Sequence, residues 1–99
     1  MDASTGTFKV NKEQNQFELH KDGHVAFLEY INEGKKIYLT HTEAPEALQG
    51  TGAAKELVKN SLQYSRDNNL TVVPSCSYVA NYVNKNTEWR DVLSEGYQM

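Results

Sequence analysis

A glycine-rich segment, residues 49–54, has the composition and spacing in this chain that best indicate chemistry. It reads Gln49-Gly50-Thr51-Gly52-Ala53-Ala54, and it lies between a strand-like run and a long amphipathic stretch. A helix that begins at such a turn leaves backbone N–H groups unpaired at the positive end of the helix dipole. Glycine has no Cβ, so a ligand can approach the backbone closely. The segment therefore predicts a site for a phosphate or pyrophosphate.

Two common nucleotide motifs do not fit this segment. A dinucleotide fingerprint needs a third small residue where Lys55 stands, and no G-K-[ST] sequence is present for a P-loop. The alternative interpretation is that the glycines only begin a helix and bind nothing.

Cys76 is the second residue with chemical potential, because it falls where a predicted strand gives way to a predicted helix. A thiol at a helix N-terminus has a lowered pKa and can act as a nucleophile. The alternative is a small buried side chain, which is the role of most lone cysteines.

The elements that must position these residues begin with an antiparallel meander. Residues 1–6 are small and polar and read as a disordered leader, and residues 7–99 form a single domain. Strand-like runs at 17–20, 24–31 and 36–42 are separated by short turns rich in glycine. The run 24–31 is apolar at nearly every position, which predicts a strand covered on both faces.

A helix and a further strand follow the meander. Apolar and small residues at helical spacing predict a helix over 51–67, and a β-branched run predicts a strand over 70–73. This strand–helix–strand unit is expected to be right-handed, with its two strands parallel. Short helices are expected over 77–85 and 88–95. The predicted class is α/β (α+β), a meander followed by a βαβ unit.

The chain resembles the GCN5-related N-acetyltransferase (GNAT) family over residues 17–93. The motifs that carry the resemblance, in order, are His41-Thr42-Glu43, the glycine segment 49–54, Pro74-Ser75-Cys76-Ser77-Tyr78, Tyr82 and Trp89-x-x-Val-Leu. They are similar to those of a short branch of minimal acetyl-CoA-binding proteins, the YjdJ type. The chain departs from that branch at 86–89, where a His-Pro-Glu-aromatic sequence is common, so the last helix is expected to start differently.

The resemblance implies a minimal GNAT fold whose two central strands splay apart around acetyl-CoA. The pantetheine arm would pair with the strand end, and the pyrophosphate would rest on the glycine segment, with charge added by Lys55 or Lys59. The implied cofactor-binding residues are His41, Thr42, Glu43, Ala44, Gln49, Gly50, Thr51, Gly52, Ala53 and Ala54.

Three residues are candidates for catalysis in such a site. Cys76 could accept the acetyl group, and Tyr82 or its neighbour Tyr78 could protonate the leaving CoA thiolate. His41 is expected on the same strand face as Ile37 and Leu39, from where it could act as a base. The alternative for His41 and both tyrosines is packing in the core.

The acceptor is not indicated by any motif. Larger members of the family have two helices between the first strands, whereas only the Asp22-Gly23 turn stands there in this chain. An open acceptor site suits a large or protein-borne amine. The predicted function is acetyl transfer from acetyl-CoA to an amine; the alternatives are a non-catalytic acyl-CoA-binding or sensing module, or an interaction domain that has lost the cofactor.

The composition of the chain limits which partners it can bind and in which cellular compartment it is expected. The net charge of −3 and the lack of clustered Lys and Arg argue against nucleic acid. No apolar run reaches the roughly 18 residues that a membrane span needs. A single cysteine suits the reducing cytoplasm, and one Cys with three scattered His matches no zinc spacing, so no metal is expected.

Overall fold

The computed structural model describes residues 6–93, so the predicted leader lies outside the described range except for Gly6. In chain order the elements are β1 (Thr7–Asn11), β2 (Gln16–Lys21), β3 (His24–Glu33), β4 (Lys36–Glu43), the 3-10 turn η1 (Glu46–Leu48), α1 (Ala53–Asp67), β5 (Thr71–Pro74), α2 (Ser77–Lys85) and the 3-10 helix η2 (Thr87–Val92).

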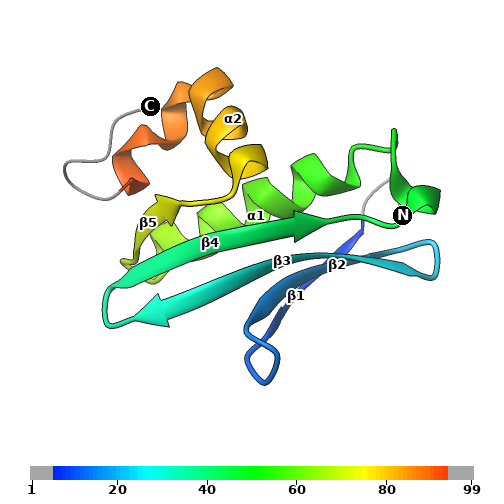
Figure 1. Ribbon diagram of the computed structural model, residues 1–99, viewed down its shortest axis with the longest axis horizontal. Helices are drawn as coiled ribbons and strands as arrows, with labels where there is room; N and C mark the ends of the chain where they lie inside the picture. The colour runs from blue at the N-terminus through cyan, green and yellow to red at the C-terminus, as the bar shows by residue number, and fades with distance from the viewer. Residues whose placement is uncertain (1–5, 94–99) are drawn as a thin grey trace.

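The five strands form one sheet in the order β1-β2-β3-β4-β5 (Figure 1). The first four are antiparallel neighbours, and β5 runs parallel to β4 after the crossover through α1. The predicted meander and βαβ unit are confirmed. The sequence interpretation did not identify β1, although Phe8 and Val10 alternate there with exposed residues.

The core lies between α1 and one face of the sheet. Leu57, Leu62 and the sheet residue Leu28 are fully buried within it. The opposite face of β3 has no comparable cover within residues 6–93, since Val25 is 37% and Ile31 is 54% exposed. The expectation that 24–31 is covered on both faces is therefore wrong, because apolar side chains on an antiparallel strand can face water.

A β-bulge at Thr40 interrupts the alternation of β4. Tyr30 of β3 pairs with Leu39, but the preceding residue Glu29 pairs with His41, so one extra residue is accommodated on β4. Each residue of β4 after the bulge therefore points to the face of the sheet opposite the one it would occupy in a regular strand. His41 consequently lies exposed on the face opposite Leu39, and the prediction that it shares the face of Ile37 and Leu39 is wrong.

β4 and β5 separate where β5 ends. They pair from Lys36–Thr71 to Leu39–Pro74, and β4 then continues to Glu43 paired with β3 but not with β5. The N–H of Cys76 donates to the carbonyl of Leu39 at 2.8 Å, which fixes the start of α2 at the point of separation. The predicted splay of the central strands is thus present beside Cys76.

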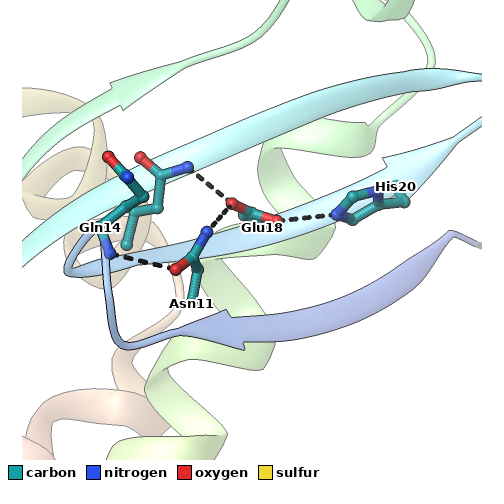
Figure 2. A network of polar contacts seen from close by, with 5 residues as sticks. Asn11, Gln14, Glu18 and His20 are labelled. Atoms are coloured by element: carbon teal, nitrogen blue, oxygen red, sulfur yellow. Dashed lines mark hydrogen bonds and ion pairs between the residues drawn. The ribbon is translucent and has the colours of Figure 1, made fainter.

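The β1–β2 hairpin carries a polar cluster around Glu18 (Figure 2). The Glu18 carboxylate accepts from Asn11 Nδ2 at 2.9 Å and from Gln16 Nε2 at 2.7 Å, and its other oxygen lies 2.8 Å from His20 Nε2. These hydrogen bonds, led by that of Gln16, lower the pKa of Glu18 to about 2. The ionised form is therefore strongly favoured in the folded chain.

Glu18→Gln should destabilise the fold at pH 7 by about 1 to 3 kcal/mol, because it removes the charged acceptor of this cluster. The folded pKa is below the unfolded value, so the Glu18 contribution is complete above the unfolded value of 4.5 and is lost as pH falls towards 2. Urea unfolding at pH 7 and pH 3 measures this, with the exposed turn variant Glu13→Gln as control. Equal stability losses at both pH values for Glu18→Gln would contradict the assignment.

Candidate functional site

The glycine segment forms a left-handed turn that leads directly into α1. Gly50 has φ +81° and Gly52, the N-cap of α1, has φ +85°, a region that L side chains rarely adopt. The helix starts at Ala53, two residues later than predicted, because the chain needs both left-handed residues before it can enter the helix.

This turn leaves a group of backbone donors free. The N–H of Thr51 bonds to Leu48 and that of Ala53 to Thr51 Oγ1. Within residues 6–93, no acceptor is present for the N–H groups of Gly50, Gly52, Ala54 and Lys55. Unpaired N–H groups at a helix N-terminus favour an anion.

The free donors border an open pocket with a volume of about 480 Å³, which we call the glycine-loop hollow. It is lined by Ala44, Leu48, Gln49, Gly50, Gly52, Ala53, Ala54, Lys55 and Tyr78. The end of β4, the turn, the first turn of α1 and the first turn of α2 therefore meet at one place. Gln49 Nε2 lies 3.4 Å from the carbonyl of Ala44, which links the turn to the strand end.

Cys76 is the N-cap of α2 and is partly buried beside the end of β4. Burial by itself raises the pKa of the thiol. The hydroxyl of Thr42, 3.3 Å from Sγ, and the backbone N–H groups of Val79 and Tyr78 favour the thiolate, and the net effect is a lowered pKa. This environment matches that of a reactive cysteine. The bulge at Thr40 is what turns Thr42 towards the thiol.

The two tyrosines of α2 differ in position. Tyr78 lies on the same first helical turn as Cys76 and lines the glycine-loop hollow, with 41% of its surface exposed. Tyr82, one turn further along, does not line that hollow. Burial raises the pKa of the Tyr82 hydroxyl above its usual value.

The structure gathers most of the predicted cofactor-binding residues and leaves some outside. Ala44, Gln49, Gly50, Gly52, Ala53 and Ala54 all line the hollow. Thr51 supports the turn, Thr42 contacts Cys76, and His41 pairs with Glu43 at 2.8 Å on the exposed face. The sequence interpretation did not identify Leu48 as a residue that lines the hollow. Nothing in the sequence around a leucine in a 3-10 turn distinguishes a residue that lines a binding site from one that packs in the core.

Within residues 6–93, no helix is both long and apolar enough to cross a membrane.

A mixed sheet whose two parallel strands part beside a glycine turn at a helix start defines an acetyltransferase fold of the GNAT class. The chain belongs to the GCN5-related N-acetyltransferase family, whose profile matches residues 16–92.

Relatives and a solved structure are similar to the chain over most of its length. Protein NATD1 from Mus musculus is 35% identical over 81 residues, which covers 77% of this chain and 72% of the relative. Protein NATD1 from Homo sapiens is also 35% identical, with 70% of the relative covered. The solution structure of a GCN5-like protein from Staphylococcus aureus superposes with a TM-score of 0.66 at 26% identity, covering 96% of this chain and 97% of that one. The expected minimal GNAT fold is confirmed.

Proposed function

We propose that this protein binds acetyl-CoA at the glycine-loop hollow and transfers its acetyl group to an amine, by way of Cys76. The observation that carries the proposal is the set of free N–H groups at 50, 52, 54 and 55, which opens onto a hollow shared with Tyr78. Two phosphates in series match such a row of backbone donors. Ala44, the residue directly after the separated part of β4, lines the hollow, which supports placing the pantetheine arm beside this strand.

Cys76 supplies the nucleophile in this proposal. Its thiolate attacks the acetyl carbonyl carbon, a new C–S bond forms, and the bond to the CoA sulfur breaks. The CoA thiolate leaves and takes a proton, for which the Tyr78 hydroxyl on the same helical turn is the nearest proposed donor. An amine then attacks the acetyl-cysteine, its C–N bond forms as the C–S bond to Cys76 breaks, and the Cys76 thiolate is regenerated. The amine loses its proton to solvent, and solvent returns a proton to Tyr78.

His41 has no role in this scheme. It lies on the exposed face of β4 in contact with Glu43, whereas Thr42 is the neighbour of the thiol.

The lone cysteine also supports the proposal of a reducing, cytoplasmic setting. The acceptor amine is proposed to be large or protein-borne, because only the short turn at Asp22-Gly23 joins β2 to β3 and no helix stands there to wall a small pocket.

A non-catalytic acyl-CoA-binding module is the second candidate, and the same openness favours it. Within residues 6–93, no helix stands between β2 and β3 to hold a small acceptor in place. A binding module would take acetyl-CoA with the same affinity but would release it unchanged. Analysis of the acetyl-CoA after prolonged incubation distinguishes the two candidates.

Titration of the protein with acetyl-CoA, followed by amide NMR, should shift the signals of Gly50, Gly52 and Ala54 first. The reason is that their N–H groups are free and would donate hydrogen bonds to the phosphate oxygens. Gly23 and Gly34 are internal controls, since they have the same left-handed backbone but lie in hairpin turns. Equal shifts at all four glycines, or shifts at the controls alone, would argue against this site.

A further inference from the structure

A pocket that the proposed function does not use lies at the end of α1 opposite the glycine turn. It has a volume of about 230 Å³, and we call it the tyrosine pocket. It is lined by Lys12, Asn15, Tyr30, Asn32, Ile37 and Tyr64, so the β1–β2 turn, the end of β3, the start of β4 and the last turn of α1 meet there. Because Tyr64 lies about 16 Å from Ala53 along the helix axis, this pocket is separate from the glycine-loop hollow.

Tyr30 brings a buried hydroxyl without a partner to this pocket. The residue is fixed in place, since its backbone N–H donates to the carbonyl of Asn15 at 2.9 Å and its ring packs on Phe17 with the centroids 4.7 Å apart. Tyr30 is only 8% exposed, yet its hydroxyl has no hydrogen-bond partner within residues 6–93. Buried tyrosine hydroxyls usually have a partner, so this one indicates a ligand that supplies it.

Two further donors reach the same pocket. The ring of Tyr64 also packs on Phe17, with the centroids 5.3 Å apart, and its hydroxyl is likewise unpaired in the part of the chain that the structure describes. Burial, and after it the proximity of Tyr64, raises the pKa of the Tyr30 hydroxyl, so the two phenols are close enough to influence each other. Lys12 is exposed, and no carboxylate of residues 6–93 lies within ion-pair distance of its ammonium.

The two asparagines of the pocket are partly engaged by the protein itself. Asn32 Nδ2 donates to the carbonyl of Gly34 at 3.2 Å and to that of Lys36 at 2.8 Å. The backbone carbonyl of Asn15 accepts from Tyr30. Asn32 and Asn15 therefore hold the turns around the pocket, and the donors left for a ligand are mainly the two phenols and the ammonium.

We propose that the tyrosine pocket binds a small carboxylate with an apolar body. The carboxylate would accept from the hydroxyls of Tyr30 and Tyr64, with Lys12 supplying the opposite charge from the exposed side. Within residues 6–93 no carboxylate lines the pocket, and one cation matches a single negative charge better than the double charge of a phosphate monoester. Ile37 and the ring of Tyr64 offer the apolar wall, and the small volume limits the body to roughly one ring.

Amide NMR titration with acetate, butyrate and benzoate at constant ionic strength tests this inference, with acetamide, butyramide and benzamide as the uncharged counterparts. At least one carboxylate should shift the signals of Asn15, Tyr30 and Ile37. It should bind about ten-fold more tightly than its amide, because charge-assisted hydrogen bonds distinguish the two.

Two substitutions locate the binding. Tyr30→Phe should weaken carboxylate binding about ten-fold, and it should fold normally because it keeps the ring and removes a hydroxyl that is unpaired. Lys12→Gln should weaken it in the same direction. The matched controls are Tyr38→Phe, next to Ile37 but on the other face of β4, and Lys9→Gln on β1; neither residue lines the pocket.

Every other outcome overturns the inference. Carboxylates that shift no signal around the pocket at millimolar concentrations would show that it holds water alone. Equal affinity for the acids and their amides would remove the role of the phenols and the ammonium. A loss in Lys9→Gln as large as that in Lys12→Gln would be a general effect of net charge. Acetyl-CoA binding is a separate measurement, since the two sites share no residue.

Discussion

Ala54→Glu is expected to weaken acetyl-CoA binding by roughly a hundred-fold while the fold is kept. Ala54 lines the glycine-loop hollow and is not fully buried, so there is room for the longer side chain. A carboxylate a few ångströms from a phosphate costs about 3 kcal/mol at the effective dielectric of a protein surface, which corresponds to that factor. The same carboxylate is favourable for the helix itself, because acidic residues stabilise its first turn.

Calorimetry with acetyl-CoA measures this effect, and Gln63→Glu is the control. That variant adds the same charge to an exposed position later in α1, and it is expected to bind normally. A bulky replacement of Gly52 is a poorer test, because φ +85° makes any side chain there strained. Lost affinity would then be confused with lost stability. Unchanged affinity in folded Ala54→Glu would place the cofactor somewhere other than this hollow.

Cys76→Ala should abolish acetylation of the protein, which we expect to see as one added acetyl group after incubation with acetyl-CoA. The thiol has a lowered pKa and stands at the strand separation, where the thioester is proposed to lie. Intact mass spectrometry measures the adduct, and calorimetry should find acetyl-CoA binding retained in Cys76→Ala. A persistent single adduct in this variant would show that a different residue accepts the acetyl group.

The contact with Thr42 permits a finer test of the same thiol. Thr42→Val removes the hydroxyl that favours the thiolate, so the pKa of Cys76 should rise and the pH profile of its alkylation should move upward. Ser77→Ala removes a hydroxyl from the neighbouring residue, which is exposed, and should leave the profile in place. Identical profiles in wild type and Thr42→Val would remove the physical basis for a reactive Cys76.

Much of the fold follows from local patterns in the sequence. The turn at Asp22-Gly23, the helical spacing of Leu57 and Leu62, and the short run before Pro74 each predict one element, and the topology rules connect them. The glycine turn was also predictable, because left-handed residues at a helix start are limited to a few residue types.

The wrong predictions concern how helices and strands pack against one another, and local sequence patterns do not specify that packing. Periodicity assigns His41 to a face by counting from Leu39, and a bulge changes that count without a distinctive residue to mark it. Apolar density at 24–31 predicts burial, yet whether a second layer covers the strand depends on segments elsewhere in the chain. Which tyrosine lines the glycine-loop hollow depends on where α2 lies against α1, so Tyr78 could not be distinguished from Tyr82 in advance.

The bulge at Thr40 also bears on how the partner of the thiol can change between related chains. Odd-numbered residues of β4 face the core as far as Leu39, but beyond Thr40 the inward residue is the even-numbered Thr42. In a chain of equal length whose strand ran straight, the imidazole at position 41 would take the place of the hydroxyl beside Cys76. Loss of a single irregularity in the backbone, with every side chain retained, would therefore exchange a hydrogen-bond donor for a proton acceptor at the sulfur.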